Sequence, residues 1–131
     1  MNERDRTYFI ERVGREMDAD LPELQLSVPE ALAAACRIIA REGHESGLAG
    51  QVTARAENPD TWWTLQLGYG FEEATAARMA LVDADLKPLA GGRPNPGVRF
   101  HVWIYRKRPD VNAIIHTHAP WASALAATGK P

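Results

Sequence analysis

The sequence predicts a single α/β domain in which helices pack on a mixed, largely antiparallel sheet. Three observations lead to this fold class. Apolar residues recur at helical spacing after residue 27, strand-like segments lie on either side of a turn within residues 51–67, and a helix-spaced segment precedes a short apolar run at 111–116. A chain of 131 residues that is 45% hydrophobic can bury a core without disulfides or a structural metal.

The first clear helix signal follows Ser27, which has Glu30 three residues later, the spacing of a capping box. The helix should end at Gly43, because glycine readily adopts the positive φ of a C-terminal cap. Residues 1–26 are expected to form a leader helix or an arm that packs on a neighbouring subunit. The apolar positions that recur at helical spacing are Leu32, Ala35, Cys36, Ile39 and Ala40.

The period then changes from helical to alternating. Residues 51–55 alternate, 58–60 have turn chemistry, and 61–67 are rich in aromatic and β-branched residues, which predicts two antiparallel strands. The apolar run 79–82 and the segment 87–89 predict a second hairpin.

The last third of the chain alternates between helix and strand signals. Residues 98–108 return to helical spacing until Pro109 stops them. Residues 111–116 are predicted to be a buried strand, and 121–127 a helix that begins at Pro120.

Composition argues against several classes of partner. The chain has a net charge of −2 and a pI near 6.1, so it lacks the excess of Lys and Arg that nucleic acid binding needs. The N-terminus lacks the apolar core of a signal peptide, and no window is apolar enough to span a membrane. Cys36, the only cysteine, lies in an apolar segment and is expected to be a buried, reduced thiol. We therefore expect a soluble, cytoplasmic protein.

Two of the four histidines, His116 and His118, lie at the end of the strand predicted at 111–116. Side chains alternate along a strand, so both imidazoles should lie on one face. Two neutral imidazoles so placed can bind one divalent cation, although a His-x-His pair also arises by coincidence.

The other two histidines are candidates for a further role, since catalytic zinc usually takes three protein ligands. His101 borders the apolar face of its predicted helix, which favours a packed or interfacial histidine. His44 follows Gly43 in a glycine-bearing loop, where it is either a ligand contact or a surface histidine.

Two glycine-rich loops, 68–71 and 91–97, are either turns or sites for an anion or substrate. Glycines let backbone amides approach an anion, and the second loop precedes a predicted helix N-terminus. Neither loop has a Walker or dinucleotide-binding pattern.

The order of these segments resembles the class II aldolase/adducin domain over residues 27–131. The most specific block is 108–118, in which an Arg-Pro-Asp hinge leads through an apolar strand to His-x-His. The other matching blocks are 50–55, which resembles a Gly-Asn-hydrophobic-Ser-x-Arg motif, Gly70-Phe71, Leu81-Val82-Asp83, Arg93-Pro94 and Arg99-Phe100-His101.

The resemblance implies a three-layer α/β/α domain assembled into tetramers, with active sites between subunits. By resemblance, His116 and His118 would bind zinc or another divalent metal (manganese, cobalt or iron) together with a later third histidine. The metal would polarise a carbonyl or enediolate oxygen, which serves both aldol cleavage and decarboxylation. The residues expected to complete the site are His44 as acid or base and Gln51, Gly70 and Asn95 as substrate contacts.

The sequence departs from the family pattern at three site positions. Gly97 stands where the aldolases have an acid/base carboxylate, Asn95-Pro96 replaces a Ser-Ser pair, and Gln51 replaces an asparagine. These departures leave room for decarboxylation, for His44 as a relocated base, or for loss of activity. They favour a carboxylated or aromatic substrate over a sugar phosphate.

The predicted function is therefore that of a divalent-metal-dependent carbon–carbon lyase acting on a small hydroxy-carbonyl or carboxylate substrate, as a homo-oligomer. The sequence stops at Pro131, before the position of the family's third histidine, so we expect a domain incomplete at its C-terminus, with low intrinsic stability or tight self-association. Two alternatives remain, namely a non-catalytic oligomerisation or binding module and an inactive truncated remnant.

Overall fold

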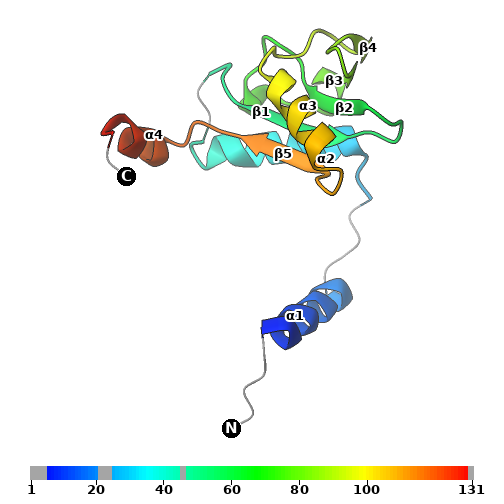
Figure 1. Ribbon diagram of the computed structural model, residues 1–131, viewed down its shortest axis with the longest axis vertical. Helices are drawn as coiled ribbons and strands as arrows, with labels where there is room; N and C mark the ends of the chain where they lie inside the picture. The colour runs from blue at the N-terminus through cyan, green and yellow to red at the C-terminus, as the bar shows by residue number, and fades with distance from the viewer. Residues whose placement is uncertain (1–5, 21–24, 45–46, 130–131) are drawn as a thin grey trace.

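The computed structural model describes residues 6–20, 25–44 and 47–129. Parts of the predicted N-terminal arm, residues 1–5 and 21–24, lie outside the described residues. The elements are α1 (Arg6–Asp20), α2 (Val28–Arg41), β1 (Gln51–Arg55), β2 (Thr61–Leu65), the 3-10 turns η1 (Phe71–Glu73) and η2 (Ala76–Arg78), β3 (Met79–Asp83), β4 (Pro88–Ala90), α3 (Val98–Lys107), β5 (Ala113–His116) and α4 (Pro120–Ala127) (Figure 1).

The five strands form one sheet in the order β4-β3-β2-β1-β5. Every pairing between the described strands is antiparallel, including the pairing of β1 with β5 that brings distant parts of the chain together. The expected α/β fold with a largely antiparallel sheet is confirmed, and both hairpins form as predicted.

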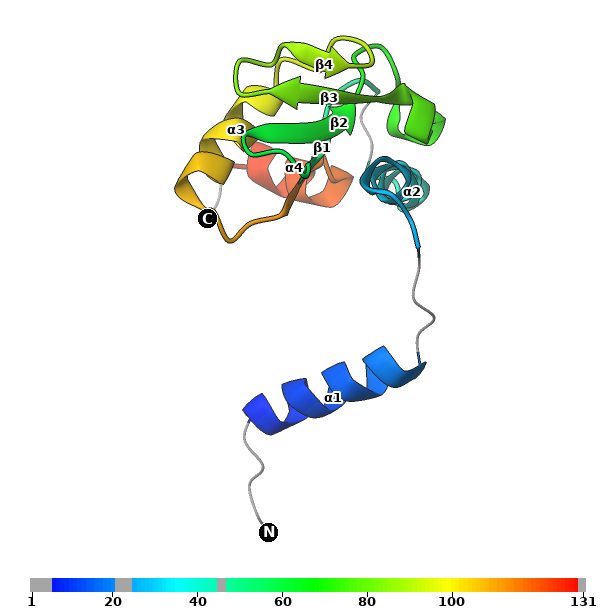
Figure 2. The same cartoon turned by 90° about the vertical axis from the view of Figure 1, so that its right-hand side faces the viewer.

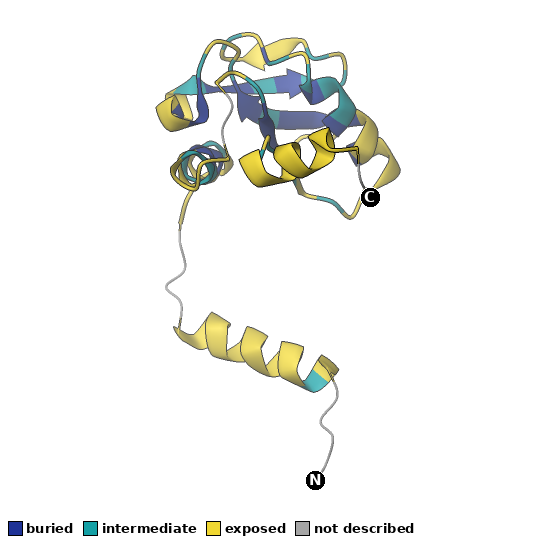
Figure 3. Cartoon of the chain, turned by 90° about the vertical axis from the view of Figure 1, so that its left-hand side faces the viewer, coloured by how far each residue is buried: buried dark blue, intermediate teal, exposed yellow. Residues whose placement is uncertain are grey.

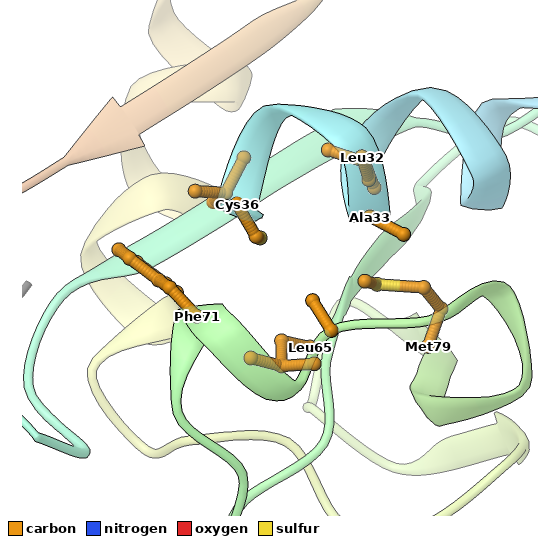
Figure 4. Close-up of a cluster of buried hydrophobic side chains, with 8 residues drawn as sticks. Leu32, Ala33, Cys36, Leu65, Phe71 and Met79 are labelled. Atoms are coloured by element: carbon orange, nitrogen blue, oxygen red, sulfur yellow. The ribbon is translucent and has the colours of Figure 1, made fainter. Parts of the chain in front are cut away.

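Helices cover the two faces of this sheet, as the alternation of side chains along the strands requires. The core under α2 contains Cys36, whose thiol is fully buried, and burial raises its pKa to about 12. Figures 1 and 2 show α3 on the opposite face from α2. The buried side chains under α2 are Leu32, Ala33, Cys36, Val52, Leu65, Phe71, Ala74 and Met79 (Figure 4), and those under α3 are Trp62, Ala80, Val82, Val98, Val102 and Tyr105.

The α2 helix begins and ends as the sequence predicts. The Ser27 backbone N–H donates to the Glu30 carboxylate at 2.8 Å, which holds the first turn. At the other end Gly43 has a φ of 72°, and its N–H donates to the Ala40 carbonyl at 2.9 Å. The His44 N–H donates to the Ile39 carbonyl at 3.1 Å and completes a Schellman motif, so the cap fixes the backbone at residue 44.

The prediction of a buried strand at 111–116 is wrong in one respect, because β5 is an edge strand. Ile114 packs against the core under α3, but Ala113 is exposed and Ile115 is 57% exposed. The side of β5 that faces away from α3 opens into an apolar groove of about 410 Å³. An apolar run in the sequence cannot tell an edge strand from a central one, since that depends on which distant strands pair.

Residues Arg6–Asp20 of the N-terminal segment form a helix, and both alternatives for this segment, a leader helix and an arm that packs on a neighbouring subunit, stay predictions. Helix α1 buries no side chain and lies apart from the sheet in Figures 1 and 3. None of the helices in the described part of the chain is both long and apolar enough to cross a membrane.

Candidate metal and substrate site

The two histidines at the end of β5 lie side by side. The ring centroids of His116 and His118 are 5.0 Å apart, with the rings tilted by 56°. Phe100 of α3 meets the His116 ring edge to face at 5.1 Å, which places His116 on the α3 side of the sheet. Partial burial, and then the neighbouring His118, lower the pKa of His116, which favours the neutral imidazole that binds metal ions.

Gln51 contacts His116 directly across the sheet. The two residues are cross-strand partners in the β1–β5 register, and the Nδ1 atom of His116 lies 2.7 Å from Oε1 of Gln51. Because an amide oxygen only accepts, Nδ1 carries the proton and donates. The Nε2 atom of His116 therefore keeps its lone pair.

This donor set fits part of a divalent-metal site. Two neutral imidazoles suit zinc, manganese, cobalt or iron, and Nε2 of His116 has the lone pair that coordination requires. Within the described ranges no cluster of three or more His, Cys, Asp or Glu side chains is arranged to hold a metal. The pair therefore fits two of the ligands that such a cation takes.

Asn95 and Gly97 lie next to Gln51, at the start of α3. The Asn95 side chain donates from Nδ2 to the Leu48 carbonyl at 3.0 Å, and its Oδ1 accepts from the Gly97 N–H at 2.9 Å. Asn95 thus ties the loop before β1 to the N-terminus of α3. A Cβ atom at Gly97 would lie 2.8 Å from Nε2 of Gln51, so these two residues are in close contact.

A small pocket opens beside Gln51 and Asn95, with an interior volume of about 10 Å³, room for about one water molecule. Gly70 only flanks it, and its N–H donates to the Glu73 carboxylate at 3.0 Å. Gln66 also lines this pocket, and the sequence did not predict it. The only signal for it in the sequence is a polar residue at the end of a predicted strand. The lining residues are Gly47, Leu48, Ala49, Gly50, Gln51, Thr64, Leu65, Gln66, Leu67, Gly68, Tyr69, Phe71 and Asn95.

His44 is the sequence candidate that the structure does not bring to this group. It is exposed at the C-terminal cap of α2, and no hydrogen bond or ring contact among the described residues joins it to Gln51, Asn95 or His116. Its role as an acid or base stays a prediction.

His101 is packed, as its position on the helix predicted. It is fully buried, and its Nδ1 lies 2.8 Å from the Thr53 hydroxyl, which in turn lies 2.9 Å from the Tyr105 hydroxyl. Burial, and then the nearby His116, lower the pKa of His101 to about 4. The three side chains fix α3 on β1.

Arg55 anchors the chain just before β5. Its Nε donates to the Val111 carbonyl and one of its terminal nitrogens to the Tyr105 carbonyl, both at 2.8 Å. These bonds join β1 to the end of α3 and to the segment that leads to the two histidines, so they help to position the site.

Several known proteins are similar to this chain in both sequence and fold. L-fuculose phosphate aldolase of Escherichia coli O157:H7 is 31% identical over 96 residues, covering 73% of this chain and 44% of that protein. 3,4-Dihydroxyphthalate decarboxylase of Arthrobacter keyseri is 36% identical over 101 residues, covering 70% of this chain and 40% of that protein. The solved structure of L-fuculose 1-phosphate aldolase from Glaciozyma antarctica PI12 superposes with a TM-score of 0.75 at 30% identity, covering 85% of this chain and 50% of that one.

The chain thus spans half or less of the length of these relatives. The sequence profile of the class II aldolase and adducin N-terminal domain matches residues 30–131, which include every candidate site residue. With the antiparallel sheet and the shared fold, this match shows that the chain belongs to the class II aldolase and adducin N-terminal domain family.

Proposed function

We propose that this domain is part of a divalent-metal-dependent carbon–carbon lyase in which His116 and His118 are metal ligands. The observation that carries the proposal is the pairing of the two rings at 5.0 Å, with Gln51 bonded to Nδ1 of His116. The names of the relatives, which include aldolases and decarboxylases, support this class of reaction. A bound metal would stabilise negative charge on a substrate oxygen, which both reactions require.

Decarboxylation is the reaction that this set of side chains favours. Aldol cleavage requires a base that removes a proton from a substrate hydroxyl, and Gly97 supplies none. A substrate carboxylate is already ionised at neutral pH and leaves as CO₂, so bond breaking needs no base. The Asn95 amide is committed to backbone groups, which also disfavours a cradle for a sugar phosphate. We therefore propose a small substrate that carries its carboxylate on the carbon next to a carbonyl or other electron-accepting group. The electron pair of the broken C–C bond then moves onto the substrate oxygen as an enolate, which takes up a proton after CO₂ has left.

The chain's own residues would bind and orient this substrate. Gln51 has a side-chain nitrogen for which no acceptor is described within the resolved ranges, and it lies beside Gly97, so it can donate to a substrate oxygen. The phenyl ring of Phe100 covers one side of His116 and limits the access of water. We also propose a homo-oligomer, supported by the half-exposed apolar side chains of Phe9, Val13 and Met17 along one stripe of α1.

Metal binding by the untagged chain tests the proposal. Equilibrium dialysis against Zn²⁺ should show binding that His116→Ala weakens at least tenfold, whereas His44→Ala, a histidine replaced outside the pair, should bind as the wild type does. Stoichiometric metal retained by His116→Ala would overturn the assignment.

Turnover is tested separately with the metal-loaded protein. CO₂ release from a panel of small hydroxy-carbonyl and aromatic carboxylates should be metal-dependent and lost in His116→Ala. If the chain binds metal through the pair but releases neither CO₂ nor an aldol cleavage product, the lyase assignment is refuted for this chain and the binding-module alternative is favoured.

A further inference from the structure

We infer that Gln51 is a positioning residue that fixes the proton of His116 on Nδ1, and that the lack of a side chain at Gly97 is what allows it to do so. The inference rests on the proposed role of His116 as a metal ligand. It adds a defined task for Gln51, and it links two departures from the family pattern that looked independent in the sequence.

The hydrogen bond is built into the sheet. Gln51 and His116 are paired in the β1–β5 register, so their side chains lie on the same face and start from neighbouring backbone positions. The bond is 2.7 Å long, and Gln51 is only 7% exposed, so little water competes for its amide oxygen. The contact is therefore a consequence of register and burial.

The bond decides which nitrogen of His116 is free. A neutral imidazole carries one proton, and either ring nitrogen can hold it. The amide oxygen of Gln51 accepts a hydrogen bond from Nδ1 of His116, which keeps the proton on Nδ1. The lone pair of Nε2 is then available to bind a cation. Metal-binding histidines commonly depend on such a partner on the other ring nitrogen, and its loss typically weakens metal binding by 10–100-fold.

The absence of a side chain at Gly97 matters for its contact with Gln51 and not for its own backbone conformation. Its φ of −60° and ψ of −18° are ordinary right-handed values, so the backbone itself does not require glycine. A side chain here would instead displace the Gln51 amide, because a Cβ at residue 97 would lie 2.8 Å from its Nε2 and 2.9 Å from its Cδ. A side chain at 97 and the present position of the Gln51 amide exclude each other.

The ring nitrogens of His116 report the tautomer directly. In ¹⁵N-labelled protein without metal, two-dimensional NMR distinguishes a protonated ring nitrogen from an unprotonated one. We expect Nδ1 of His116 to be protonated in the wild type and this preference to be lost in Gln51→Met, which keeps the length of the side chain but cannot accept in the same way. Gly97→Ala should weaken the preference as well, because the new Cβ displaces the amide.

The matched control is Gly14→Ala, since a Cβ at Gly14 in α1 meets nothing within 4 Å. It should leave the His116 signals unchanged. A wild-type His116 protonated on Nε2, or a Gln51→Met variant with unchanged signals, would overturn the inference. If Gln51→Met does not fold, Gly97→Ala carries the same test, because it moves the Gln51 amide without replacing the residue.

Metal affinity separates this inference from the proposed function. In titrations with Co²⁺, followed by its visible absorption, Gln51→Met should bind about tenfold more weakly than the wild type and Gly14→Ala equally well. A changed tautomer with unchanged Co²⁺ affinity refutes the positioning role. Failure of every form to bind Co²⁺ instead refutes the proposed function, and the NMR result still decides whether Gln51 sets the tautomer.

Discussion

Acidification from pH 6.5 towards pH 4 should destabilise this domain through His101. The imidazole is fully buried, and its pKa falls to about 4, whereas a histidine in the unfolded chain titrates near 6.5. The unfolded state therefore binds this proton more readily. The stabilisation is fully present above pH 6.5 and is lost as the pH falls towards 4.

The size of the effect follows from the two pKa values. The difference corresponds to roughly 3 kcal/mol when the pH is well below 4, and about 2 kcal/mol of it is lost by pH 5. The hydrogen bond from Arg108 lowers the pKa of Asp110 to about 2, so that carboxyl titrates in a separate, more acidic window.

Urea unfolding at a series of pH values measures this, with tryptophan fluorescence, to which the buried Trp62 contributes, as the signal. His101→Asn keeps a polar group for Thr53 but cannot titrate, so it should show a much shallower loss of unfolding free energy between pH 6.5 and 4.5. His44→Asn makes the same replacement at an exposed position and should follow the wild-type profile. Equal slopes for the wild type and His101→Asn would refute the reasoning.

Gly50→Ala should lower the free energy of unfolding by more than 1 kcal/mol, because φ is 88° and its Cβ would lie 3.0 Å from the His116 carbonyl. Gly47→Ala, with a φ of 56° but open space, should cost less, and the reverse order in urea unfolding would contradict this. Tyr105→Phe should cost about 1 kcal/mol in the same assay through its lost bonds to Thr53, and an unchanged midpoint would argue against them. The Cys36 thiol should react with a thiol reagent at pH 8 only in denaturant, and rapid reaction of the native protein would show that it is accessible.

The local features of the fold could be predicted because short segments determine them. The capping box at Ser27 and the cap at Gly43 fixed both ends of α2 from a few residues each. The alternation of residues 51–55 gave β1, and the period of two gave the shared side of the His116 and His118 rings.

The non-local features could not be predicted in the same way. The edge position of β5 depends on its pairing with β1, which lies about sixty residues earlier, and no local pattern reports that register. The contact between Gln51 and Gly97 needs α3 to start beside β1, so the sequence showed two separate departures from a family pattern where the structure shows one contact. The exposed position of His44 likewise follows from how α2 lies on the sheet.

The edge position of β5 leaves His116, at the end of this strand, in a weakly protected part of the sheet. Four residues paired to a single neighbour can open without unfolding the rest, as local opening costs less than global unfolding. A cation that bound both rings would oppose this opening, and by mass action the protection of the β5 amides against hydrogen exchange would rise with its concentration. Occupancy by a metal and the order of this strand would then be a single equilibrium.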